Sequence, residues 1–168
     1  DFSIAYVWQT SSIDTPDFYL ITGLWGSQAG SLLFWSWLMS AFTFAALLLN
    51  WRSERRLMPY VIAVTMVTLG FFLVLNNFLE NPFERYWMNT VTDEIKPALF
   101  QPGDRWEVFN PADGEGLNPL LRHFGMVFHP PMLYLGFVGF TIPFAFAFAA
   151  LVTGQLGSGW LRATRAWA

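Results

Sequence analysis

Three uncharged, strongly apolar runs of about twenty residues constrain this chain more than any other feature. They cover residues 31–50, 60–79 and 130–152. A helix of that length is about 30 Å long, which matches the hydrocarbon core of a bilayer. Only 12% of the residues are charged, against roughly 25% in an ordinary soluble domain. The sequence therefore predicts an all-α polytopic membrane protein with three transmembrane helices.

The charged residues indicate how these helices are oriented. Arg52, Arg55 and Arg56 stand in the short turn between the first two runs, whereas the loop 80–129 carries a net negative charge. Lysine and arginine accumulate in short cytoplasmic loops of membrane proteins. We therefore expect the arginine turn to be cytoplasmic and the loop 80–129 to lie on the outer side.

The two ends of the chain, its lack of cysteine and its net charge limit the functions that it can have. The chain starts at Asp1 rather than Met and ends within an apolar pattern, so we expect an internal piece of a longer protein. It has no cysteine, which leaves no thiolate metal site, disulfide or cysteine nucleophile within it. Its net charge of −3 indicates no nucleic-acid partner. The partner that the sequence does indicate is the lipid bilayer.

The end of the outer loop predicts a short amphipathic surface helix over residues 119–128. Asn118 is a suitable N-cap and Pro119 a suitable first residue. Pro130 disfavours the α conformation at the preceding residue, so we expect that helix to stop at His129 and the third transmembrane helix to begin at the two prolines. Residues 105–109 predict a short strand-like piece.

The turn Trp25-Gly26-Ser27, just before the first apolar run, has two interpretations. Tryptophan favours the headgroup level of a membrane, so the turn is expected to be a simple interfacial anchor. Alternatively, its small residues form a close-packed turn that shapes a pocket at the outer surface.

The histidine of Phe128-His129-Pro130-Pro131 also has two interpretations. It either bonds to headgroups or the loop, or provides an axial ligand to haem iron, for which a neutral imidazole is suitable. A stripe of mostly small residues marks the side of a membrane helix that a neighbour or a flat ligand approaches, and we expect it to turn the histidine toward the bundle interior. The stripe is His129, Met132, Gly136, Gly139, Pro143, Ala147 and Ala150.

Two polar neighbours of that histidine are weaker candidates. Arg122 has a guanidinium that is suitable for a porphyrin propionate, although an ordinary headgroup contact is the simpler role. His123 is expected to be a solvated surface residue.

Four motifs in this order resemble the cytochrome c maturation haem lyase subunits of the CcmF and NrfE type. The first is Trp25-Gly26-Ser27-x-x-Gly30-Ser31-Leu32-Leu33-x-Trp35, and the second is Asn81-Pro82-Phe83. The other two are Gly116-Leu117-Asn118-Pro119-Leu120-Leu121 and Phe128-His129-Pro130-Pro131-x-Leu133-Tyr134-x-Gly136-Phe137-Val138-Gly139-Phe140.

The resemblance implies a multi-pass protein of the bacterial inner membrane that acts as a haem lyase. Such a protein takes haem b from a periplasmic haem chaperone and positions it for thioether attachment to apocytochrome c, together with a thiol-reducing or lyase partner subunit. The lyase supplies positioning rather than a nucleophile. The alternatives are a non-catalytic haem-translocating channel and a structural membrane scaffold of the maturation complex.

The resemblance also assigns residues. It implies that His129, on the periplasmic side, is one of two external axial ligands of haem iron. The second histidine and a tryptophan-rich segment are then expected beyond Ala168, so this piece alone is expected to be inactive. The residues that would shape the pocket are Trp25, Asn118, Pro130, Pro131, Tyr134 and Gly136.

Overall fold

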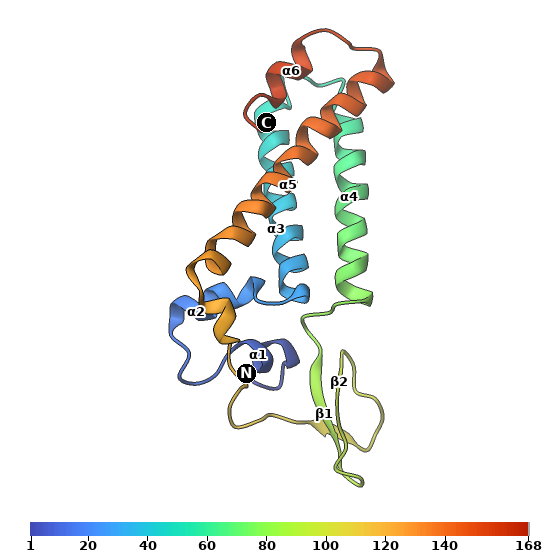
Figure 1. Cartoon of the computed structure of the whole chain (residues 1–168). Coiled ribbons are helices and arrows are strands. Elements are labelled where there is room, and N and C mark those ends of the chain that lie inside the picture. The colour runs from blue at the N-terminus through green and yellow to red at the C-terminus, as the bar shows by residue number, and fades with distance from the viewer. Residues whose placement is uncertain (168) are drawn as a thin grey trace. The chain divides into compact units, whose positions relative to one another are not determined.

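The structure is a computed structural model and describes residues 1–167. Its contacts divide the chain into two compact units, Asp1–Phe34 with Leu75–Pro130, and Trp35–Val74 with the part that begins at Pro131. The elements in chain order (Figure 1) are α1 (Ala5–Thr10), α2 (Asp17–Thr22), the 3-10 helix η1 (Gly23–Trp25), α3 (Gln28–Asn50), α4 (Met58–Phe78), β1 (Arg85–Asn89), β2 (Ile95–Ala98), β3 (Trp106–Val108), the 3-10 helix η2 (Pro119–Arg122), α5 (Phe124–Thr153) and α6 (Gly159–Thr164).

Three of these helices are long and apolar enough to cross a membrane. α3 has 23 residues, α4 has 21 and α5 has 30. The bounds of α3 and α4 lie close to the predicted 31–50 and 60–79, and Pro59 occupies the first turn of α4, where its missing N–H breaks no helical bond. The predicted fold class, a polytopic membrane protein with three spanning helices, is confirmed.

The second unit has an apolar core built from all three long helices. Leu57, Met58 and Val61 at the start of α4 pack with Ile142 and Phe146 of α5, and each of these side chains is at most 1% exposed. Small residues complete the cluster, namely Ala46, Ala145 and Ala149. Small side chains let helix backbones approach closely, which is how helices associate in a membrane.

The first unit contains a small antiparallel sheet that departs from the all-α prediction. Its strand order is β2-β1-β3, and only β3 falls in the segment 105–109 that the sequence predicted as strand-like. The N-terminal residues pair with the start of β1. The Tyr86 N–H donates to the Ser3 carbonyl at 2.7 Å, and the Ala5 N–H donates to the Glu84 carbonyl at 2.9 Å. The outer loop is therefore folded onto the start of the chain.

The start of α5 differs from the sequence prediction. We expected one helix over 119–128 and another from Pro130, but η2 ends at Arg122 and α5 runs without interruption from Phe124 through His129 and both prolines. His123 separates the two helices with an extended backbone, φ −65° and ψ 136°. The observed break, at His123, thus lies six residues before the predicted one, and His129 is a helical residue rather than a hinge.

Candidate functional site

His129 lies in the second turn of α5 and is exposed. Of the predicted stripe, Met132 and Gly136 are exposed as well, whereas Gly139 and Ala150 are buried. In the second unit, α3 and α4 pack against α5 around Ile142 and Phe146, and the orientation of His129 toward a bundle interior stays a prediction. The exposed imidazole is accessible from outside the described part of the chain.

Exposed apolar side chains precede His129 along the chain. Phe124 is 74% exposed, and its ring lies 4.6 Å from that of Phe128. Leu120, in η2, is 77% exposed. Large apolar groups of this kind cover lipid tails or the faces of flat apolar ligands.

A distant side chain bonds to one of the carbonyls that the two prolines of α5 leave without a helical donor. Pro131 has no N–H, so the carbonyl of Val127, four residues earlier, loses its helical donor. The indole Nε1–H of Trp25 donates to this carbonyl at 3.2 Å. Helix-interior prolines are tolerated where other groups bond to the freed carbonyls, and Trp25 does so here.

Trp25 belongs to a close-packed turn rather than lying free at a surface. Its ring centre is 5.3 Å from that of Phe34. A Cβ added to the next residue, Gly26, would stand 3.0 Å from Leu117 Cδ1. The Trp25-Gly26-Ser27 turn is therefore packed against two of the other motifs, one at Leu117 and the other at the start of α5.

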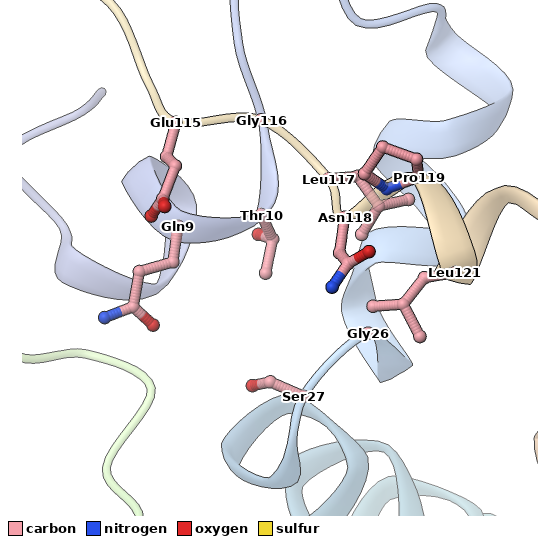
Figure 2. A pocket seen from close by; sticks show the side chains of 10 residues that line it. All are labelled: Gln9, Thr10, Gly26, Ser27, Glu115, Gly116, Leu117, Asn118, Pro119 and Leu121. Carbon is pink, nitrogen blue, oxygen red and sulfur yellow. The ribbon is translucent and has the colours of Figure 1, made fainter.

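A cavity of about 590 Å³ lies beside this turn in the first unit (Figure 2). Figure 2 shows side chains from α1, from the turn before α3 and from the loop that leads into η2 around it. Asn118, a predicted pocket residue, is one of them, and its Oδ1 accepts the Leu120 N–H at 3.0 Å, as expected of an N-cap. The lining residues are Gln9, Thr10, Gly26, Ser27, Glu115, Gly116, Leu117, Asn118, Pro119 and Leu121. His129 and Trp25 are not in this set, so the cavity is a separate feature from the histidine.

Tyr134, another predicted pocket residue, belongs to an aromatic stack in the second unit. The ring centre of Trp35 lies 5.4 Å from Tyr134, 5.8 Å from Phe137 and 4.9 Å from Phe72. Both tryptophans of the first motif thus contact α5, Trp25 in one unit and Trp35 in the other. Gly136 faces open space, since a Cβ added there would meet no heavy atom of the described residues within 4 Å.

The two polar neighbours of the site have structural partners. The Arg122 guanidinium lies 5.7 Å from the centre of the Tyr19 ring. The Nδ1 of His123 accepts the Gly125 N–H at 3.1 Å, so this ring caps the start of α5. His123 is exposed as predicted, but its capping role was missed.

Residues 1–167 contain no group of three or more His, Asp or Glu side chains that is able to enclose a metal ion. A single exposed imidazole provides one ligand, which suits a metal whose other positions are already filled, as in a porphyrin. The haem-ligand assignment of His129 stays a prediction.

Two contributors to the site were missed by sequence reasoning, Val127 and Tyr6. The position of Val127, four residues before Pro131, was a usable signal, because the carbonyl there must find a donor elsewhere. Tyr6 gave no such signal: its hydroxyl donates to the Gly23 carbonyl at 2.6 Å and the Leu24 carbonyl at 3.0 Å, which holds η1 against α1.

Comparison with known proteins places the chain in one family. The family described as cytochrome C assembly protein matches residues 25–165. The chain is 39% identical to the cytochrome c-type biogenesis protein CcmF of Escherichia coli K12 and 37% identical to CcmF of Haemophilus influenzae, over 99% of this chain and 23% of each relative. It is 32% identical to the biogenesis protein NrfE of H. influenzae, again over 99% of this chain and 23% of that protein.

The chain therefore spans less than a quarter of the length of these relatives. No solved structure matches it. The family match covers both tryptophans of the first motif, the cavity loop and α5 with His129. This chain is a member of the cytochrome c assembly protein family.

Proposed function

We propose that the chain is the part of a cytochrome c maturation haem lyase that provides His129 as one axial ligand to haem on the outer face of a bacterial inner membrane. The observation that carries the proposal is the exposed imidazole in the second turn of α5, a helix long enough to span a bilayer. The similarity to CcmF and NrfE supports the pathway.

The residues around the imidazole fit a haem. Phe124 and Phe128 are exposed apolar groups beside it, and Gly136, two turns further along α5, leaves open space. Haem b, as the substrate, supplies an iron that takes an axial ligand and vinyl groups that join to the cysteines of an apocytochrome. The role of this chain is to bind and orient the haem. Trp25, Pro130 and Pro131 shape the start of α5.

The orientation is inferred from charge. Arg52, Arg55 and Arg56 follow α3, and Arg162 follows α5, which favours a cytoplasmic location for both helix ends. His129, near the opposite end of α5, is then periplasmic. There it is accessible to a haem chaperone, to apocytochrome c and to a thiol-reducing or lyase partner subunit. Arg122 is a candidate for a propionate contact.

The test is haem binding by the full-length protein. We expect His129→Ala to lose most of the Soret absorbance of the purified protein and to stop cytochrome c maturation in cells, with exogenous imidazole restoring part of both. His123→Asn is the matched control, because it removes the other imidazole six residues earlier and keeps a side chain that can cap the start of α5. If His129→Ala keeps both the Soret band and maturation, the ligand assignment is wrong and a scaffold role is favoured.

A further inference from the structure

Pro130 and Pro131 remove the helical donors of the Met126 and Val127 carbonyls, and of these two residues Met126 is 43% exposed. An α-helix joins each N–H to the carbonyl four residues earlier. Pro131 has no N–H, so it cannot donate to the Val127 carbonyl. Val127 is only 4% exposed, so solvent is a poor substitute for the lost donor. A buried carbonyl without a partner is costly, and a helix with that defect bends or breaks.

The donor that replaces the missing N–H comes from 102 residues earlier in the chain. Trp25 Nε1 donates to the Val127 carbonyl at 3.2 Å. The indole is held in place by its neighbours: its ring packs against Phe34, and the Trp25 carbonyl accepts the Ser31 hydroxyl at 3.3 Å. The orientation of the indole N–H is therefore set by contacts of Trp25 outside α5.

His129 lies between the bonded carbonyl and the proline that made the bond necessary. We infer that Trp25 is a positioning residue for His129: its indole N–H takes the place of the helical bond deleted by Pro131 and keeps α5 helical through the histidine. Without that bond, the segment from Val127 to Pro131 is released to the non-helical conformation that Pro130 favours at residue 129. The haem part of this inference rests on the proposed function, whereas the bond itself does not.

The bond can be tested on the haem-free full-length protein by hydrogen exchange of the peptide segment 124–133. We expect Trp25→Phe, which keeps a ring against Phe34 and removes only the donor, to raise exchange there about three- to tenfold, the range for one lost hydrogen bond. Trp51→Phe is the matched control, because it changes an exposed tryptophan beyond the other end of α3, and it should leave the segment unchanged.

A second variant separates the bond from a general packing role of the ring. Pro131→Ala returns an N–H to the helix, so Val127 regains its ordinary donor. We expect Trp25→Phe combined with Pro131→Ala to exchange as slowly as the wild type in this segment. If Trp25→Phe does not speed exchange, or if Pro131→Ala does not reverse the effect, the inference is wrong.

The functional consequence is read from the Soret band. Trp25→Phe should lower haem loading at normal protein levels, and excess imidazole should restore it, since a free ligand needs no positioning. Faster exchange with unchanged haem loading would overturn the positioning role. Failure of His129→Ala to reduce haem would instead refute the proposed function, while the exchange result would still decide whether the bond holds the helix.

Discussion

The hydroxyl of Tyr6 occupies the space that a side chain at Gly30 would need. A Cβ built on Gly30 overlaps both the Tyr6 hydroxyl and the Leu24 carbonyl, and that hydroxyl is fixed by its 2.6 Å bond to the Gly23 carbonyl. The first turn of α3 is thereby joined to α1 through a contact that only glycine permits.

We therefore predict that Gly30→Ala lowers the stability of the purified full-length protein by about 1–3 kcal/mol, as an overpacking substitution does. The measurement is thermal unfolding in detergent. Gly70→Ala is the control, because a Cβ on that glycine of α4 meets nothing within 4 Å of the described residues, and alanine is the better helix former by about 1 kcal/mol. A Gly30→Ala protein as stable as Gly70→Ala would contradict the packing of Tyr6.

The aromatic stack in the second unit predicts opposite results for two changes of Trp35. Its indole Nε1 is buried and has no hydrogen-bond partner among the described residues. Trp35→Phe keeps the stacking partner and removes that unpaired group, so we expect unfolding temperatures equal to or above the wild type. Trp35→Ala removes the ring and should cost about 3–5 kcal/mol. Equal losses for both variants would show that the indole N–H has a partner elsewhere in the full-length protein.

The open face at Gly136 gives a prediction for haem. A Cβ added at Gly136 meets no heavy atom of the described residues within 4 Å, so we expect Gly136→Leu to keep normal protein levels. If haem approaches this face, the added side chain stands in its way, and the Soret absorbance per protein should fall severalfold. Gly157→Leu, at an equally open position beyond α5, should leave the absorbance unchanged. An unchanged Soret band in Gly136→Leu removes that glycine from the proposed pocket.

Membrane orientation is open to a labelling test. Ser53, in the arginine turn, and Asp104, in the outer loop, are both exposed, and this chain has no cysteine of its own. In a full-length protein without other accessible cysteines, a membrane-impermeant maleimide added to cells whose outer membrane is permeable to it should label Asp104→Cys. Ser53→Cys should be labelled only after the inner membrane is opened. The reverse pattern would place His129 on the cytoplasmic side.

The sequence predicted the helices well because their signal is local. Uncharged runs of membrane length define α3 and α4 by composition alone, and the capping geometry of Asn118 followed from its neighbour Pro119. β1 and β2 pair with each other as a local antiparallel hairpin, with Met88 opposite Ile95, and were missed because Lys96 and Pro97 break the alternation typical of a strand; other contacts of the sheet are long-range. Tyr86, for example, bonds to Ser3 across a wide stretch of sequence.

The error at the histidine also involves a long-range contact. The proline after residue 129 locally favours a helix break, but the backbone is helical there, and the donor to the Val127 carbonyl comes from Trp25, far away in the sequence. Spacing indicates that the small residues of the stripe share one face of α5. It does not indicate whether this part of the chain covers that face.

The bond between Trp25 and Val127 also has a consequence for biosynthesis. The ribosome completes Trp25 and α3 long before α5 emerges, and chains fold from the N-terminus as they are made. The indole donor is therefore synthesised before the Val127 carbonyl that accepts its hydrogen bond. The helix can therefore form through its two prolines during insertion, and the bond at Val127 depends only on chain that has already been synthesised.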